Sequence, residues 1–309
     1  MKLIGIDVGG TNFRVGVFSG TDLLDEKRFE ADFSLLCNTK SSVEAQSAIV
    51  ATISAAIAGA LERFPDIAAA GIGFPGFIDP ETMRIKSSPN LPNLRNVDIA
   101  TPLSRRFGIP VVVENDALAA ACGEHALGES SSLIYMGLGT GVGGGLVLNG
   151  NPYPGENGVA MEVGHIIVVP GGRACGCGNC GCLEQYASAS GVVKTYFELA
   201  GTHLSAKEIA HLAGNGDPDS LRAFDLAGEM LGRALSHILK VLDISHVVIG
   251  GGLSESWHLM EKPFRESLEA DLVAVLRGKT QVRVSEARDR AGMLGAARLA
   301  LKNRDGAEF

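Results

Sequence analysis

The chain has 309 residues, of which 46% are hydrophobic and 20% are charged, and it carries a net charge of −8. This length and apolar content predict a folded protein with one large domain or two medium ones, each with its own core. The acidic balance argues against a protein that binds the nucleic-acid backbone, because such a protein needs a basic surface. We therefore expect no nucleic-acid partner.

The beginning of the chain has no feature of a targeting segment. MKLIGIDVGG has a single lysine and continues directly as an apolar strand, without the hydrophobic stretch and small-residue cleavage site of a signal peptide. No apolar run approaches the roughly 20 residues that span a bilayer. We therefore expect no membrane partner and a cytoplasmic location, where thiols stay reduced.

Two segments of the chain have the same pattern of apolar residues and glycines. Residues 3–18 read LIGIDVGGTNFRVGVF and residues 133–148 read LIYMGLGTGVGGGLVL, with Gly9 opposite Gly139 in an ungapped comparison. Each segment predicts a strand, a glycine turn and a second strand. Two such hairpins, each opening one half of the chain, predict a duplicated α/β architecture.

The rest of the chain alternates short strands with longer helices. Short apolar runs that end in turn residues predict strands, and Ala, Leu and Ile at helical spacing predict helices. The predicted strands are 67–76, 108–115 and 246–254, and the predicted helices are 43–63, 116–127, 217–241 and 291–301. No linker-like tract separates the halves, so we expect any hinge to be internal, near residues 115 and 291.

The first glycine turn, DVGGT, follows a strand and leads into another strand. A Walker A loop and a Rossmann fingerprint both open a helix, so this topology excludes both. The N–H groups of Gly9 and Gly10 and the hydroxyl of Thr11 are suited to contacting phosphate. Asp7 stands where a metal could bind. One such turn can equally be a plain hairpin, but its counterpart at 139–145 favours phosphate binding from two sides.

VENDALAAA places two polar side chains where a buried strand meets a helix. Proteins with α/β folds bind their ligands at the carboxyl ends of strands, which favours a functional role for Asn115 and Asp116. Asp116 can equally be the residue that caps the helix. This segment alone leaves both interpretations open.

GHIIVVPGGRACGCGNCGCLEQ holds four of the six cysteines. Their Cys-x-Cys spacing is poorly suited to disulfides, and a reducing compartment does not favour them. Thiolates at short spacing on a glycine-rich loop are good zinc ligands, so a zinc site is favoured over a redox role. The ligands are either the four cysteines, Cys175, Cys177, Cys180 and Cys182, or three of them with His165. Glu162 and Glu184 stand close to this cluster in the sequence.

IGIDVGGT, GFPG, VENDA, GLGTGVGGG, EVGH, CGCGNCGCLE and VVIGGGLS occur in the order and spacing of the ROK family of bacterial sugar kinases. The chain resembles this family from residue 3 to about 301. EVGH with the cysteine element is highly specific, whereas DxGGT is shared with the wider hexokinase and actin-like superfamily. The resemblance implies an actin-like ATPase (ribonuclease H-like) duplicated α/β fold, with a cleft between two domains. The smaller domain would be 1–115 plus 292–309, and the larger 116–291.

The resemblance also implies an activity and a set of site residues. The protein would transfer phosphate from ATP to a hexose or N-acetylhexosamine at O6, with Asp116 as the general base and Mg²⁺ held by Asp7 through water. Sugar contacts would come from Gly76, Asn90, Asn115, Asp116, Glu162, His165 and Glu184. Nucleotide contacts would come from Asp7, Gly9, Gly10, Thr11, Gly139, Thr140, Gly141, Gly251 and Gly252. A structural zinc would be bound by His165, Cys175, Cys177 and Cys182, with Cys180 on a variable position. The family also suggests a homodimer.

Two positions depart from the family pattern. Leu118 stands where many members carry asparagine, and Leu94 stands where glucokinase-like members often carry tryptophan. Both positions are expected to lie near the sugar-binding site. The acceptor therefore stays open among glucose, N-acetylglucosamine, N-acetylmannosamine, mannose, fructose and allose.

Three other functions compete with a sugar kinase. A sugar-responsive ROK regulator would carry a helix-turn-helix, and we expect none because the chain reaches Asp7 almost at once. An actin-like or chaperone-like ATPase would act without a sugar, which the grouping of Glu162, His165 and Glu184 disfavours. A non-catalytic sugar-binding protein is disfavoured by Asp116.

Overall fold

The computed structural model describes residues 1–304 except Asn90, Pro92 and Arg288. The chain divides into two compact units. Unit 1 comprises Met1–Ser132, Gly145–Ala160 and Asp289–Phe309, and unit 2 comprises Leu133–Gly144 and Met161–Arg288. Two five-stranded sheets form the framework, which matches the duplicated α/β architecture expected from the two glycine hairpins. The domain boundaries at 115/116 and 291/292 stay a prediction.

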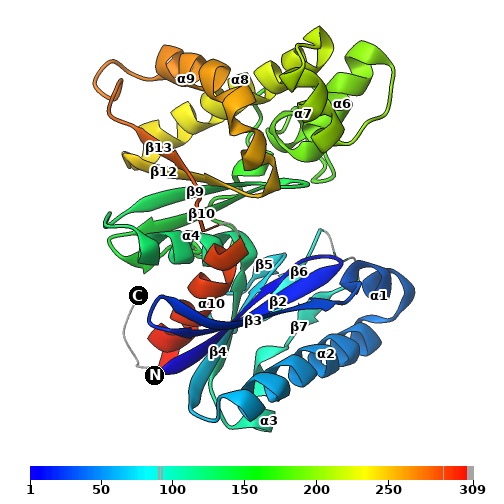
Figure 1. The fold of residues 1–309 in the computed structure, drawn as a ribbon, viewed down its shortest axis with the longest axis vertical. Coiled ribbons are helices and arrows are strands. Elements are labelled where there is room, and N and C mark those ends of the chain that lie inside the picture. Colours follow the sequence, from blue (N-terminus) through cyan, green and yellow to red (C-terminus); the bar gives the residue numbers. More distant parts are fainter. Residues whose placement is uncertain (90, 92, 288, 305–309) are drawn as a thin grey trace. The chain divides into compact units, whose positions relative to one another are not determined.

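The first sheet has the order β3-β2-β1-β4-β8 (Figure 1). Its strands are β1 (Lys2–Val8), β2 (Asn12–Ser19), β3 (Asp22–Glu30), β4 (Ile67–Phe74) and β8 (Val111–Asn115). β1 pairs with β2 in antiparallel fashion, while β1, β4 and β8 are parallel neighbours. The carboxyl ends of these three parallel strands therefore meet at one edge of the sheet. Asp7 and Asn115 both lie there, opposite Gly73 and Phe74 of β4.

Among the described residues, unit 1 also contains five helices and a small sheet. The helices are α1 (Phe33–Thr39), α2 (Ser42–Arg63), α3 (Ala100–Phe107), α4 (Asp116–Leu127) and α10 (Asp289–Arg304). The small sheet consists of β5 (Phe77–Ile78), β6 (Ile85–Ser87) and β7 (Arg95–Val97). A capping box closes the start of α2, where the Ser41 hydroxyl and the Glu44 carboxylate each bind the other residue's backbone N–H.

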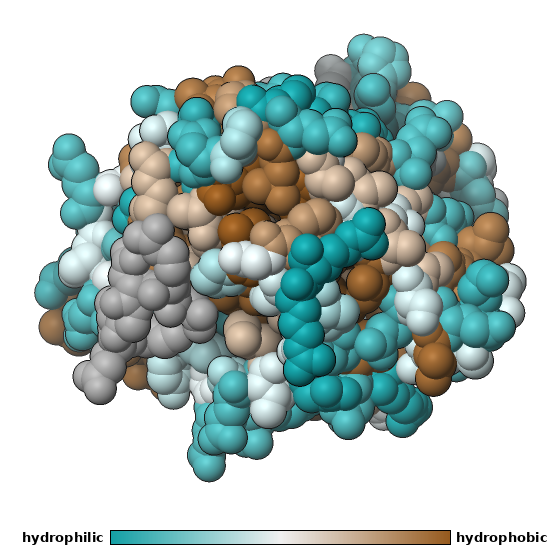
Figure 2. Space-filling view, turned by 90° about the horizontal axis from the view of Figure 1, so that it is seen from below, coloured by the Kyte–Doolittle hydropathy of each residue, from teal (hydrophilic) through white to brown (hydrophobic). Residues whose placement is uncertain are grey.

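Helix α2 is long and apolar enough to cross a membrane by length and composition. The expectation that no apolar run approaches the length of a membrane span was therefore wrong. Its isoleucines at 49, 53 and 57 are fully buried in the core of unit 1. The helix also has a charged residue in its first turn, Glu44, and another in its last turn, Arg63. One face of α2 is thus buried in the core, and a core helix of a folded protein can be as long and as apolar as a membrane span. Apolar residues also occur on the surface, and Figure 2 shows a group of them bordered by hydrophilic residues.

Helix α10 returns from the end of the chain to pack directly on the first sheet. Added Cβ atoms at Gly5 and Gly71 would lie 1.8 and 1.7 Å from the carbonyl oxygens of Met293 and Ala296. On the other side of the helix, a Cβ at Gly295 would lie 1.7 Å from the carbonyl of Ala119 in α4. These glycines are therefore required by close backbone approach. They bring the first residues of α10 next to the carboxyl end of β1.

The second sheet has the order β11-β10-β9-β12-β13. Its strands are β9 (Leu133–Leu138), β10 (Val142–Leu148), β11 (Asn151–Pro152), β12 (His246–Gly250) and β13 (Gln281–Val284). By the unit bounds, β9, β12, β13 and the start of β10 belong to unit 2, while β11 and the rest of β10 belong to unit 1. The helices of unit 2 are α5 (Glu184–Ala187), α6 (Ala189–Ala200), α7 (Ala206–Gly214), α8 (Pro218–Leu242) and α9 (Trp257–Asp271). Two short 3₁₀ helices, η1 (Val163–His165) and η2 (Gly252–Ser256), lie at glycine-rich turns.

The predicted elements are all present, with shifted ends. Both glycine hairpins form, as β1–β2 and β9–β10, and the predicted helix 116–127 is α4. Predicted strand 108–115 begins only at Val111, because Gly108 with φ +67° ends α3 and Pro110 follows it. Strand β3 and helix α9 were not predicted. β3 is an edge strand with mostly exposed residues, and α9 contains an internal proline, Pro263.

Candidate active site and metal centre

The junction of β8 and α4 resolves the two interpretations of Asn115 and Asp116. The Asn115 side chain accepts a hydrogen bond from the Leu118 N–H at 3.0 Å, so Asn115 is the N-cap of α4. Its amide also donates to the Gly76 carbonyl at 3.1 Å, which ties the GFPG turn to the end of β8. Asp116 is the first residue of the helix and is therefore not needed as the cap. Its carboxylate accepts the N–H of Ala117 at 2.9 Å.

Two carboxylates of unit 1, Asp7 and Asp116, have raised pKa values at this edge of the sheet. Burial, and after it the negative charges of Asp116 and Asp289, raise the pKa of Asp7 to about 7, while Arg14 opposes them. Burial also raises the pKa of Asp116, against the opposing hydrogen bond from Ala117. Arg14 is itself paired with Asp289 at 2.6 Å. A pair of desolvated carboxylates of this kind is suited to taking a proton or to binding a divalent cation.

Two further residues at this edge of the sheet were not predicted from the sequence. An added Cβ at Gly292, in the first turn of α10, would lie 3.0 Å from the Asp7 carboxylate carbon. Glu114 precedes Asn115 on β8 and accepts its N–H at 2.8 Å. Burial raises the pKa of Glu114 to about 7, although that hydrogen bond lowers it. Only the return of α10 beside β1 gives Gly292 its place, so no local pattern could have indicated it.

The β1–β2 turn presents the first predicted phosphate-binding segment. The Gly9 N–H bonds the Asn12 carbonyl at 2.9 Å, which closes the turn. The carbonyls of Gly10 and Thr11 accept the N–H groups of Ser34 and Ala31, so the turn is fastened to the start of α1. Gly9 and Thr11 are exposed. A rigid turn with exposed backbone is suited to contacting phosphate oxygens.

The corresponding turn of unit 2 is built in a similar way. The Gly139 N–H bonds the Gly141 carbonyl at 2.9 Å, and the Gly139 carbonyl accepts the N–H of Ala189 at the same distance. Thr140 at the tip is exposed. Gly251, with φ +80°, packs so closely that a Cβ would lie 2.4 Å from the Leu138 carbonyl. Gly251, which follows β12, therefore lies beside the residue that precedes Gly139, and Gly252 begins η2.

Glu184 is fixed by the glycine turn of unit 2. Its carboxylate accepts the Val142 N–H at 3.2 Å, and an added Cβ at Gly141 would lie 2.2 Å from the same oxygen, Oε2. Glu162 precedes η1, and its carboxylate lies 3.8 Å from Nε2 of His165. The structure thus brings the predicted sugar contacts of unit 2 next to its turn and its cysteine loop. Asn90, also predicted to contact sugar, lies outside the described residues.

The four predicted metal ligands come together in unit 2. The candidate ligand atoms of His165, Cys175, Cys177 and Cys182 all lie within 4.8 Å of one another. Cys175 Sγ lies 3.6 Å from Nδ1 of His165, and the sulfurs of Cys177 and Cys182 are also 3.6 Å apart. A tetrahedral ion with bonds of ordinary zinc length requires about 3.5 Å between N and S and about 3.8 Å between two sulfurs. Three thiols and an imidazole at this spacing fit such an ion.

The electrostatics of the cluster differ among its thiols. A hydrogen bond from the backbone at Asn179 lowers the pKa of Cys177, which favours its thiolate. Burial raises the pKa of Cys182 to about 12. A bound cation would be needed to keep Cys182 ionised, because a coordinating thiol loses its proton to the metal. Nδ1 of His165 faces the thiols while Nε2 faces Glu162, the arrangement in which a carboxylate orients a ligating imidazole.

The site residues are thus distributed over both units. Unit 1 carries Asp7, Gly9, Gly10, Thr11, Gly76, Asn115 and Asp116, and unit 2 carries Gly139, Thr140, Gly141, Glu162, His165, Glu184, Gly251, Gly252 and the three cysteines of the cluster. Cys180 is exposed and does not belong to the group of candidate ligands. Each unit therefore carries one glycine turn and at least one of the predicted carboxylates.

Comparisons with known proteins show the family of the chain and its fold. The ROK family model matches residues 3–303. A glucokinase of Thermotoga maritima is 35% identical over 99% of both chains, and an N-acetyl-D-glucosamine kinase of Pasteurella multocida is 32% identical over 96% of this chain and 98% of its own. The crystal structure of a ROK family glucokinase from Streptomyces griseus in complex with glucose and AMPPNP superposes with a TM-score of 0.80, at 34% identity over 98% of this chain and 100% of that chain. The fold is that of the actin-like ATPases. The chain therefore belongs to the ROK family.

Proposed function

We propose that the protein is an ATP-dependent sugar kinase that phosphorylates a hexose or an N-acetylhexosamine at O6, with Asp116 as the general base. The observation that carries the proposal is the half-buried Asp116 carboxylate of raised pKa at the β8–α4 junction, in a chain that aligns end to end with enzymes named glucokinase and N-acetyl-D-glucosamine kinase. Asn115 caps the helix, which leaves Asp116 available for chemistry. A carboxylate of raised pKa is suited to accepting the hydroxyl proton as the oxygen attacks phosphorus.

The remaining predicted residues have roles in the same reaction. The glycine turns at 9–11 and 139–141, with Gly251 and Gly252, would position ATP, and Asp7 would hold Mg²⁺ through water. Gly76, Asn90, Asn115, Glu162, His165 and Glu184 would position the sugar. Magnesium supplies charge neutralisation on the transferred phosphate when it is bound. We also propose that the protein is a cytoplasmic homodimer. Its smaller domain would comprise 1–115 plus 292–309, and its larger domain 116–291.

A screen of sugar acceptors tests the proposed activity. The purified protein is supplied with Mg²⁺ and ATP and with each of a panel of hexoses and N-acetylhexosamines, and ADP release is followed by a coupled assay. We expect one or a few sugars to raise the rate of ADP release far above the rate measured without sugar, when water is the only acceptor. ADP release that no sugar changes would instead indicate an ATPase, and sugar binding without ADP release would indicate a non-catalytic binding protein or regulator.

The Gly141→Ala substitution tests how Glu184 is held. The new methyl group would overlap Oε2 of Glu184, so the carboxylate must leave the Val142 N–H. We expect kcat/KM for the sugar to fall by about 10-fold or more, because a misplaced positioning group weakens the oriented complex. Gly214→Ala is the matched control, since a Cβ at that residue meets nothing within 4 Å. Equal kcat/KM in both variants would remove Glu184 from the sugar site.

We further propose that His165, Cys175, Cys177 and Cys182 bind one structural zinc. With all four positions occupied by protein the ion has no open site, so its role would be to hold the loop that carries Glu162 and Glu184. Cys177→Ser and Cys180→Ser form a matched pair, because both thiols are exposed on the same loop. We expect Cys177→Ser to lose zinc and to melt at a lower temperature, while Cys180→Ser keeps about one zinc per chain. Zinc content that Cys180→Ser lowers as much as Cys177→Ser would contradict the assigned ligands.

A further inference from the structure

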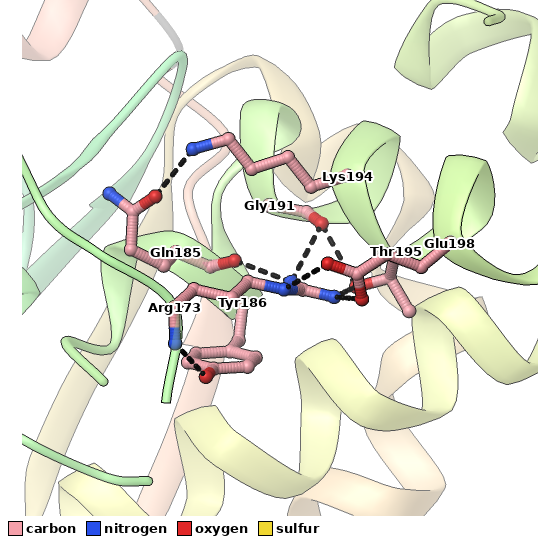
Figure 3. A network of polar contacts seen from close by, with 7 residues as sticks. All are labelled: Arg173, Gln185, Tyr186, Gly191, Lys194, Thr195 and Glu198. Carbon is pink, nitrogen blue, oxygen red and sulfur yellow. Dashed lines mark hydrogen bonds and ion pairs between the residues drawn. The ribbon is translucent and has the colours of Figure 1, made fainter. Parts of the chain in front are cut away.

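Gln185 connects the candidate metal ligand Cys175 to a lysine on the next helix. Its side chain is buried, and Nε2 donates to Cys175 Sγ at 3.5 Å. Its amide oxygen accepts a hydrogen bond from Lys194 Nζ at 2.5 Å. Figure 3 shows Lys194 reaching back from α6 to the Gln185 amide. The two side chains form a directed series of donors that ends on a sulfur.

The direction of the Gln185 amide follows from the chemistry of its neighbour. An ammonium group can only donate hydrogen bonds, so it requires the amide oxygen on its side. The amide nitrogen must then face Cys175. A sulfur that receives this N–H is best stabilised as a thiolate, which is the form that binds a metal.

We propose that Gln185 and Lys194 are positioning residues of the metal centre, which orient the Cys175 sulfur and stabilise its negative charge. The proposal rests on the zinc site of the proposed function. A zinc ion with three thiolates and a neutral imidazole carries a net negative charge, and Cys175 is buried. Donors from outside the ligand set therefore make the charged site less costly to bury, and such outer partners influence metal affinity strongly.

Arg173 makes the support for this pair rigid. Its guanidinium donates to the Gln185 carbonyl at 2.6 Å and to the Thr195 hydroxyl of α6 at 2.9 Å, and it lies 4.6 Å from the centre of the Tyr186 ring. The backbone N–H of Arg173 also donates to the Tyr186 hydroxyl at 2.9 Å (Figure 3). Glu198 pairs with the guanidinium at 2.5 Å and balances its charge. The cysteine loop, α5 and α6 are thereby joined two residues before Cys175.

Substitutions at the two ends of the series test the proposal. Gln185→Glu keeps the side-chain shape and the acceptor for Lys194 but places an oxygen against the sulfur. Lys194→Met keeps the aliphatic stem and removes the group that orients the amide. Zinc affinity is measured on the full chain by competition with a chromophoric chelator, without nucleotide or sugar. We expect about 10–100-fold weaker zinc binding in Gln185→Glu and a smaller loss in Lys194→Met.

A spectroscopic measurement separates an effect on the sulfur from a general loss of stability. In the Co²⁺-substituted protein, the thiolate-to-cobalt charge-transfer band should move to longer wavelength in both variants, because a sulfur without its donor releases electrons more easily. Lys207→Met, an exposed lysine on α7, is the control and should change neither quantity. Lys194 is exposed along its stem, so Lys194→Met provides the test even if Gln185→Glu fails to fold.

The outcomes distinguish this proposal from the zinc site on which it rests. Wild-type affinity and an unshifted cobalt band in Lys194→Met would overturn the role of the Gln185–Lys194 pair while the zinc site stands. A wild-type protein that binds neither Zn²⁺ nor Co²⁺ would overturn both. Weaker binding together with a shifted band supports the pair.

Discussion

The Asp116→Asn variant is expected to lose sugar phosphorylation, with kcat lowered by about 10²–10⁴-fold. An amide cannot take the proton that the sugar hydroxyl releases. It can still accept the N–H of Ala117, the hydrogen bond that Asp116 makes at 2.9 Å. Because Asn115 caps α4, the helix does not depend on the Asp116 charge. The loss should therefore appear in the rate and not in folding.

The measurement is single-turnover and steady-state phosphorylation with the best acceptor from the sugar panel. The zinc content of Asp116→Asn should equal that of the wild type, and its melting temperature at neutral pH should be at least as high, because the amide removes a desolvated charge. Asp22→Asn, which changes an exposed carboxylate of β3 in the same unit, is the matched control and should keep full activity. Because burial raises the pKa of Asp116, wild-type activity should also fall as the pH drops below that raised value. Turnover at the wild-type rate in Asp116→Asn would remove this residue from the role of base.

The Asp7→Asn variant is expected to be inactive and yet more stable at neutral and alkaline pH. The pKa of Asp7 rises from 3.8 to about 7 on folding, because of burial first and then the charges of Asp116 and Asp289. Between these two values the folded state binds a proton that the unfolded state has released. Stability therefore falls as the pH rises through this range and stays low above about pH 7. Asparagine carries no charge and avoids this loss.

We expect the melting temperature of Asp7→Asn to exceed that of the wild type by about 2–5 °C at pH 8, and by much less at pH 4. In the same variant, kcat/KM should fall by about 10²-fold or more relative to the wild type, because several kcal/mol of transition-state stabilisation depend on the metal ion. Melting curves from pH 4 to pH 8 without Mg²⁺, together with phosphorylation assays, measure both effects. A melting temperature lowered at every pH would mean that the Asp7 charge is compensated in the folded protein. Full activity would mean that it holds no metal.

The opposite signs of these two effects have one physical origin. A carboxylate that must bind a cation or accept a proton cannot be neutralised by a permanent partner. Arg14 is the nearest opposing charge, and it is already paired with Asp289 at 2.6 Å. The folded protein without ligands thus retains two desolvated acids, Asp7 and Asp116, at one sheet edge. Such stored repulsion is typical of sites that are stabilised only when their ligands are bound.

Local sequence patterns determined the secondary structure and the chemistry of the ligands. Alternating apolar residues around glycines predicted both hairpins, and helical periodicity predicted α2, α4, α8 and α10. These signals are readable because strand and helix periods depend on neighbouring residues alone. The cysteine spacing indicated a metal site for the same reason, since its thiols come from one short loop. The choice of His165 over Cys180 came from the family resemblance, and the structure brings that set of four together.

Only the tertiary structure decided which distant residues act together. The hydrogen bonds of the Asn115 side chain to the Leu118 N–H and to the Gly76 carbonyl show that Asn115, and not Asp116, caps α4. Gly292 lies beside Asp7 only because α10 packs against β1. Gln185 lies between Cys175 and Lys194 only because α6 packs beside the cysteine loop. A raised pKa likewise needs the burial and charges that packing creates. Contacts of this kind leave no periodic signal, because the residues that make them are separated by whole elements of the fold.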